Sequence, residues 1–322
     1  MTRLYDQLRQ YDSAAWSRAL DEIIPAIHEI DRNATRIWFA FWPLDLYVAL
    51  ESAEQPVALA RKLGLMGRWR LADQIDDSHR FLFSHRYWPQ VKAVLMSDRD
   101  WPGDLKALIT IVADAAARTA RADREMLLGM SAVALMTLRQ VGVESFAAAP
   151  GQIRLSSEAH RRSPHQVLRR RAKDDWQGLL GFTRGLKKQW TVTFDENDPD
   201  ARFPLINGQE IATAAQADKR EYRSTEPRCT PDEGPIPVEC RAASCGTCWV
   251  GILAGAEKLS PVVERDEGKR MKVFGYTDTD EARPIIRLAC QARAFGAVSI
   301  VIPPWNGIFG DHLKRQKAEG TT

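Results

Sequence analysis

Four cysteines in the last third of this 322-residue chain constrain its structure more than any other feature. Three of them lie in the segment CRAASCGTC, at Cys240, Cys245 and Cys248, and Cys290 follows after 41 further residues. Thiolates are strong ligands for zinc and iron, and an irregular loop can wrap three closely spaced ones around one centre. The sequence therefore predicts a metal or iron-sulfur site that has these four cysteines as ligands.

The spacing of the cysteines also distinguishes a structural zinc site from an iron-sulfur site. Structural zinc sites usually take their ligands from two CxxC-like pairs, whereas here three cysteines crowd together and the fourth stands alone. C-x4-C-x2-C with one distant cysteine is the spacing of plant-type [2Fe-2S] sites. Small residues at 242–244 and 246 allow backbone N–H groups to approach the sulfurs. We expect a [2Fe-2S] cluster, with a zinc ion as the alternative.

A family resemblance supports this expectation. CRAASCGTC resembles the cluster loop of the plant-type [2Fe-2S] ferredoxin family, and LACQARAFGAVSIVI resembles the segment that carries the last ligand and the final strand. The resemblance covers roughly residues 188–305. Three departures are visible: Ala243 at a position often occupied by glycine, an insertion at 223–235, and the 41 residues before Cys290.

The resemblance implies a β-grasp fold, in which a mixed sheet is crossed by one helix. Short strand-like runs bounded by turn residues fit that order, and residues 210–222 are the candidate for the crossing helix. The predicted strands are 190–194, 203–206, 236–239, 249–253 and 298–302.

The first 150 residues contain no cysteine and show helical periodicity. Apolar residues repeat at helical spacing over 16–30, with Asp12 or Ser13 as the cap and Pro25 as a kink or a junction of two helices. The same periodicity predicts helices over 105–116 and 125–139, the second of them central because it is apolar nearly all round. Aromatic residues near 37–43 indicate a packed core, with a docking face or a second cofactor pocket as the alternative.

We therefore expect a multidomain protein, all-α at the N-terminus and α+β in the ferredoxin-like part. A chain of this length exceeds one typical domain of about 100 to 200 residues. The predicted divisions are a helical domain at 1–150 for docking partners, a basic connector at 151–187, the [2Fe-2S] domain at 188–305 and a polar tail at 306–322. Residues 151–190 carry 10 basic and 3 acidic groups, which favours an acidic protein partner or a solvated linker.

Other candidate sites are weaker. His79 and His85 are six residues apart and do not share a helix face, so we interpret them as surface or packing residues. Cys229 is predicted to be a bystander thiol without a partner. Glycines at 178, 181 and 185 lack the spacing of a dinucleotide-binding loop, so no flavin or nicotinamide site is expected. Trp249 follows a predicted ligand and is expected to pack in a strand, with shielding of the cluster or a place on the electron path as the alternatives.

These features favour a one-electron carrier or an electron-transfer subunit over a self-contained enzyme. The expected partners are a protein donor and a protein acceptor, one of them with an acidic surface; nucleic acid and a membrane span are not expected. The alternatives are a redox-sensing regulator, whose cluster state changes binding by the connector, and a purely structural cluster. No export signal is evident and the cysteines have metal-ligand spacing, so we expect a cytoplasmic location.

Overall fold

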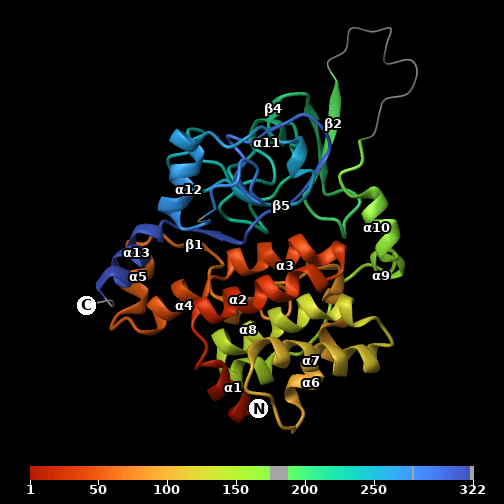
Figure 1. Ribbon diagram of the computed structural model, residues 1–322. Coiled ribbons are helices and arrows are strands. Elements are labelled where there is room, and N and C mark those ends of the chain that lie inside the picture. The colour runs from red at the N-terminus through yellow and green to blue at the C-terminus, as the bar shows by residue number, and fades with distance from the viewer. Residues whose placement is uncertain (175–187, 278, 320–322) are drawn as a thin grey trace. The chain divides into compact units, whose positions relative to one another are not determined.

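A computed structural model describes residues 1–174, 188–277 and 279–319, and the chain divides into two compact units (Figure 1). The helical unit comprises Met1–Val48 and Arg70–Pro164. The sheet unit comprises Ala49–Trp69 and His165–Thr322. The expected combination of an all-α part and a ferredoxin-like α+β part is confirmed. Residues 175–187 of the predicted connector, which include the glycines at 178, 181 and 185, lie outside the described residues.

The helical unit is built from short and medium helices around one long helix, α8. In chain order its elements are α1 (Thr2–Leu8), α2 (Ser13–Ile23), η1 (Ile24–Ala26), α3 (Glu29–Phe41), α4 (Leu44–Glu51, which continues into the sheet unit), η2 (Leu71–Gln74), η3 (Phe83–Tyr87), α6 (Trp88–Met96), α7 (Leu105–Ala120), α8 (Arg124–Ala148) and α9 (Ser157–Arg161).

Side-chain caps begin two of these helices. The Asp12 carboxylate accepts the Ala15 N–H at 2.7 Å, and the Asp104 carboxylate accepts the Ala107 N–H at 2.7 Å. Pro25 lies in η1 between α2 and α3. The predicted caps and the junction of two helices at Pro25 are therefore confirmed.

Helix α8 forms the core of this unit. It is the one described helix long and apolar enough to cross a membrane by length and composition, but 83% of its apolar stretch is buried inside the protein. Trp38, Phe41 and Trp42 are buried beside it in the core. The central helix and the aromatic core are as predicted, and there is no clear membrane span.

Two histidines are buried in this apolar core. His79 and His85 are both fully buried, and their Nδ1 atoms lie 2.9 Å apart. Burial, followed by the charge of His85, holds the pKa of His79 well below its usual value; burial, followed by the charge of Arg80, lowers the pKa of His85 to about 4. The expectation of packing residues is confirmed and that of surface residues is wrong, because both imidazoles are 0% exposed and contact each other inside the core.

This pair predicts that acid destabilises the helical unit. Unfolded histidine has a pKa of about 6.5, so stability is fully present above that pH and falls as the pH drops toward 4, by about 1.4 kcal/mol per pH unit for each histidine. Thermal unfolding followed by circular dichroism between pH 7.5 and 4.5 measures the slope. His85→Gln should flatten it, whereas the exposed control His160→Gln should not; equal slopes in all three proteins would contradict the assignment.

The sheet unit contains a five-stranded mixed sheet of order β3-β2-β8-β5-β6. Strand β2 runs parallel to β8, and the other neighbours are antiparallel. Its strands are β2 (Gln189–Thr193), β3 (Arg202–Ile206), β5 (Trp249–Ala254), β6 (Ile286–Leu288) and β8 (Val298–Val301). Two short pairs accompany it, β4 (Gln209–Glu210) with β7 (Arg293–Ala294) and β1 (Met66–Gly67) with β9 (Trp305–Asn306). The helical elements are α5 (Pro56–Lys62), α10 (Pro164–Arg170), α11 (Ile211–Ala215), η5 (Ala256–Lys258), η6 (Glu264–Gly268), α12 (Lys269–Phe274) and α13 (Gly310–Glu319).

Two sequence predictions for this unit are wrong. Residues 236–239 form no strand, since Pro235 and Pro237 flank Ile236 and lack the N–H groups that a ladder needs. The helix predicted at 210–222 is α11 and ends at Ala215. Beyond it the Asp218 carboxylate binds local N–H and O–H groups, which competes with helical hydrogen bonding.

A remote segment of the chain completes the sheet unit. Strand β1 pairs with β9, the Arg68 N–H donates to the Pro304 carbonyl at 2.8 Å, and the Ile308 N–H donates to the Leu63 carbonyl at 2.7 Å. Residues 49–69 therefore pack with a segment more than 200 residues later, although they are flanked in sequence by helical-unit residues.

Candidate functional site

The pairing of β5 with β6 brings two of the predicted ligands together. Trp249 lies opposite Leu288, so Cys248 at the start of β5 faces the residue that follows β6. The Ala289 N–H donates to the Cys248 carbonyl at 2.9 Å, which continues the ladder by one step. Cys290 comes next, and its thiol is hydrogen-bonded to that of Cys248.

The other two cysteines lie on the loop before β5, whose backbone folds around their sulfurs. The Cys240 Sγ accepts the N–H groups of Ser244 at 3.2 Å and of Ala242 at 3.4 Å, and the Thr247 hydroxyl donates to the Cys245 Sγ at 3.2 Å. Ala243 takes a left-handed φ of 56°, and its backbone N–H bonds Cys290. The expected approach of N–H groups to sulfur is therefore present, even with alanine at the position often held by glycine.

The four thiols form two hydrogen-bonded pairs, Cys240 with Cys245 and Cys248 with Cys290. Cys248 and Cys290 are buried, whereas Cys240 and Cys245 are partly exposed. Within residues 1–174, 188–277 and 279–319, no three histidine, cysteine or carboxylate side chains converge as a mononuclear metal site would require. The thiol contacts therefore group the four cysteines as two pairs.

The pKa values of the two thiols in each pair are shifted in opposite directions. Burial raises the pKa of Cys240, but bonds from Ser244, Ala242 and Cys245 outweigh it and bring that pKa to about 7. The bond from Cys248 lowers the pKa of Cys290 to about 6, against the effect of burial. The pKa of Cys248 is raised by its bond to Cys290 and by burial, and that of Cys245 mainly by burial. One thiol of each pair is therefore poised to ionise.

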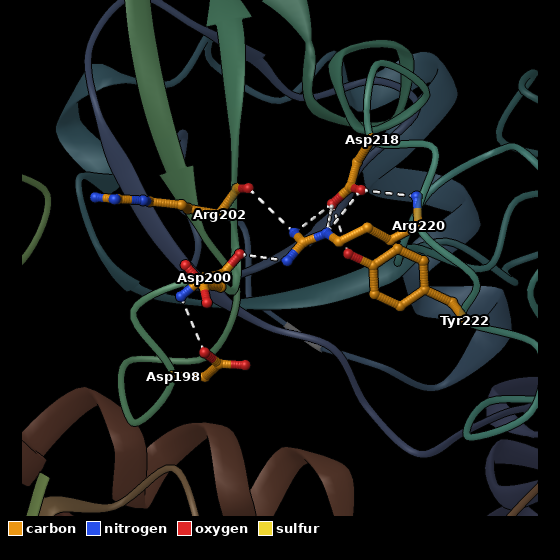
Figure 2. Close-up of polar contacts among 6 residues, drawn as sticks. All are labelled: Asp198, Asp200, Arg202, Asp218, Arg220 and Tyr222. Carbon is orange, nitrogen blue, oxygen red and sulfur yellow. Dashed lines mark hydrogen bonds and ion pairs between the residues drawn. The ribbon is translucent and has the colours of Figure 1, made fainter.

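A polar network holds the segment that leads into the cysteine loop. Figure 2 shows the Arg220 guanidinium between the Asp218 carboxylate, at 2.6 Å, and the backbone carbonyls of Asp200 and Arg202 beside β3. The Tyr222 hydroxyl also donates to Asp218, at 2.5 Å. These contacts anchor the start of the predicted insertion to the hairpin of β2 and β3.

The rest of the insertion is packed as well. Arg228 forms an ion pair with Glu226 at 2.8 Å and donates to the Pro303 carbonyl at 2.6 Å. Cys229 is buried and its thiol donates to the Pro235 carbonyl at 3.4 Å, so the expectation that it has no partner is wrong. Burial raises the pKa of Cys229 to about 12, which leaves it as an unreactive thiol at neutral pH.

A buried ion pair supports the strand that carries Cys290. The Arg287 guanidinium binds both carboxylate oxygens of Glu267 at 2.8 Å, and the two side chains are 0% and 2% exposed. The same carboxylate accepts the Leu288 N–H at 2.8 Å, and Arg287 donates to the Ser260 carbonyl at 2.8 Å. This bidentate, fully bonded geometry ties η6 to β6 three residues before Cys290.

Aromatic residues close the buried side of the cysteine loop. The rings of Trp249 and Tyr276 stack with their centres 3.9 Å apart, and the Tyr276 hydroxyl contacts the Gly246 carbonyl at 2.9 Å. Trp249 is fully buried in β5, as predicted. Gly246 has φ of 74°, and a Cβ there would lie 3.0 Å from the Tyr276 hydroxyl. The loop therefore requires glycine at 246 both for its backbone conformation and for the close contact.

Comparison with known protein families agrees with this geometry. The match is to the 2Fe-2S iron-sulfur cluster binding domain, over residues 231–295. That segment is a 2Fe-2S iron-sulfur cluster binding domain, of the family called Fer2. The Fer2 domain binds a 2Fe-2S cluster, and its matched residues include all four predicted ligands. None of the curated proteins and none of the solved structures compared with the chain matches it.

Sequence reasoning missed several residues that shape the site. Glu267 and Arg287 appear in the sequence as ordinary charged residues, and only the fold shows that they are buried together. Tyr276 lies in a segment without strand or helix periodicity. The signal that was available is the position of Arg287 inside the apolar run IIRLAC, where a charge requires a partner.

The Glu267–Arg287 pair generates a stability prediction. Arg287→Leu leaves the Glu267 carboxylate buried without its partner, so unfolding of the sheet unit should become easier by about 3 to 5 kcal/mol, and less cluster should be retained. Denaturant titration and iron analysis measure both effects. Arg293→Leu, which removes the exposed Arg293–Glu210 pair, should cost under about 1 kcal/mol. Equal losses in the two variants would contradict the role given to the buried pair.

The loop geometry predicts a specific requirement for glycine. Gly246→Ala places a side chain at positive φ, which costs about 1 to 2 kcal/mol, and adds the contact with Tyr276. Gly64→Ala is the matched control, because Gly64 has φ of 60° but no atom within 4 Å of the added methyl group. Thermal unfolding should show the larger loss for Gly246→Ala, accompanied by loss of bound iron. A Gly246→Ala protein as stable as the control would contradict the packing described.

Proposed function

We propose that this protein is a one-electron carrier or an electron-transfer subunit whose four cysteines hold a [2Fe-2S] cluster. The observation that carries the proposal is the pairing of Cys240 with Cys245 on the loop and of Cys248 with Cys290 at the strand end, inside a segment that matches the 2Fe-2S family. When bound, such a cluster cycles between two oxidation states that differ by one electron.

The paired thiols support the assignment of the ligands. A binuclear cluster requires two thiolates at each iron. We assign Cys240 and Cys245 to one iron and Cys248 and Cys290 to the other, because these are the thiols already in contact. The bystander Cys229 is not a ligand in this assignment, since its thiol is bonded to the Pro235 carbonyl.

The surrounding residues have two tasks in this proposal. N–H groups at 242, 243 and 244, with the Thr247 hydroxyl and the Gln291 amide, donate hydrogen bonds to the cysteine sulfurs and stabilise their negative charge. Trp249 and Tyr276 exclude water from the buried side of the loop. Cys240 and Cys245 remain partly exposed, which leaves the loop side open to a redox partner.

The partners follow from the proposed function. Electrons arrive from a protein donor and leave to a protein acceptor, and the helical unit is proposed to select which proteins dock. We propose a cytoplasmic, reducing location, which agrees with five unbridged cysteines. A sensing role for the connector has less support, because Arg171 is used in a partly buried ion pair with Glu196 at 2.7 Å.

Single cysteine variants of the full chain test the proposal. Cys245→Ser should lose most of the bound iron and the visible absorption that bleaches on dithionite addition, because one iron loses a thiolate. Cys229→Ser is the matched control and should keep both. Retention of iron in Cys245→Ser, or a wild-type spectrum unchanged by dithionite, would refute the carrier assignment.

A further inference from the structure

The sheet unit carries a basic region outside the cysteine loop. Helices α5, α12 and α13 contain eight basic residues and two acidic ones. The basic residues are Arg61, Lys62, Lys269, Arg270, Lys272, Lys314, Arg315 and Lys317, and the acidic ones are Asp311 and Glu319. In the described part of the chain, Arg61, Lys62, Lys314 and Arg315 are exposed and form no ion pair. Their charge is therefore available to an outside partner.

Local backbone contacts bring these helices together. The Ile308 N–H bonds the Leu63 carbonyl directly after α5, and the Phe309 N–H bonds the Phe274 carbonyl at the end of α12 at 2.9 Å (Figure 1). Two large apolar side chains near the β1–β9 pair are exposed, Met66 in β1 by 50% and Ile308 just after β9 by 44%. We call Arg61, Lys62, Met66, Ile308, Lys314 and Arg315 the α5–α13 surface.

This surface is connected to the cysteine site through two tryptophans. Trp249 follows Cys248 in the chain, and its indole N–H donates to the Trp305 carbonyl at 2.7 Å. The two rings lie edge to face with centres 5.3 Å apart. Trp305 pairs with Gly67 in β1, next to the exposed Met66. A covalent and hydrogen-bonded route thus runs from a proposed ligand to the α5–α13 surface, and electron tunnelling is faster along such a route than across a gap.

We propose that the α5–α13 surface docks an acidic redox protein and that electrons pass between this protein and the cluster by way of Trp249 and Trp305. The inference rests on the proposed carrier function. In the transfer the reduced cluster loses one electron and the one-electron centre of the partner gains it; a metal centre needs no proton, whereas a flavin reduced to its neutral semiquinone takes its proton from solvent, and no group is transferred.

The composition of the surface favours a protein over other anionic partners. An apolar centre with a charged rim is typical of transient protein interfaces, and Met66 and Ile308 lie among exposed cations. Helix α13, GDHLKRQKAE, offers only Leu313 as a large apolar side chain, so it lacks the apolar face with which helices bind lipid. The test must therefore distinguish docking of a protein from binding of nucleic acid or membrane.

The test uses the full-length protein with its cluster. We would reduce it with dithionite, remove the excess, and follow by stopped flow the reduction of oxidised flavodoxin, an acidic FMN protein, at rising salt. The wild-type rate constant should fall with salt. The triple variant Arg61→Glu, Lys62→Glu, Arg315→Glu should react about tenfold more slowly at low salt and lose the salt dependence, because steering by surface charge acts on the association rate.

Matched measurements separate docking from the carrier function. Arg169→Glu with Arg170→Glu, which reverses exposed charges on α10, should leave the rate unchanged, and all proteins should show equal iron content and bleaching by dithionite. Trp249→Phe with Trp305→Phe keeps aromatic packing but removes the indole bond and should slow transfer without changing the salt dependence. A triple variant that reacts at the wild-type rate overturns the proposal, and so does one that loses only binding to anionic vesicles or DNA. Absence of a reducible cluster in the wild type would instead refute the carrier function.

Discussion

The antiparallel register between β5 and β6 is the constraint on which the site depends. It places Cys248 and Cys290 side by side although 41 residues separate them in the chain. The 41-residue connection includes η5, η6 and α12, and it is held by the buried Glu267–Arg287 pair. Removing a buried ion pair is costly only when one partner remains, so the stability of this arrangement depends on both residues being present.

The sheet unit is larger than the segment that matches the 2Fe-2S family. It includes residues 49–69 through the pairing of β1 with β9. Residues before 175 also contribute, since Arg171 binds Glu196 and the Asp174 carboxylate accepts the Ala297 N–H at 2.8 Å. The structural environment of the cluster loop thus includes parts of the chain on both sides of the family match. The α5–α13 surface also combines both sides, since α5 precedes the matched segment and α13 follows it.

Much of the site could be predicted from sequence because cysteine spacing reflects ligand chemistry directly. The four predicted cysteine ligands and the capped helices at Ser13–Ile23 and Leu105–Ala120 follow from local patterns, and the β-grasp order follows from the family resemblance. Local patterns do not reveal long-range pairing. The pairing of Met66 with Asn306 and the burial of Arg287 depend on tertiary contacts that no short window contains. The predicted strand at 236–239 was wrong because its apolar residues are buried without the backbone donors of a ladder.

The central claim is that Cys240, Cys245, Cys248 and Cys290 hold one [2Fe-2S] cluster that carries single electrons. Electron paramagnetic resonance of the full-length protein, titrated with dithionite, tests it most directly. The account predicts a silent oxidised protein and, on reduction, a spin-one-half signal that integrates to about one spin per chain, since one electron is added to a pair of ferric irons. A protein that binds only zinc, or whose iron gives no such signal at any potential, would contradict it.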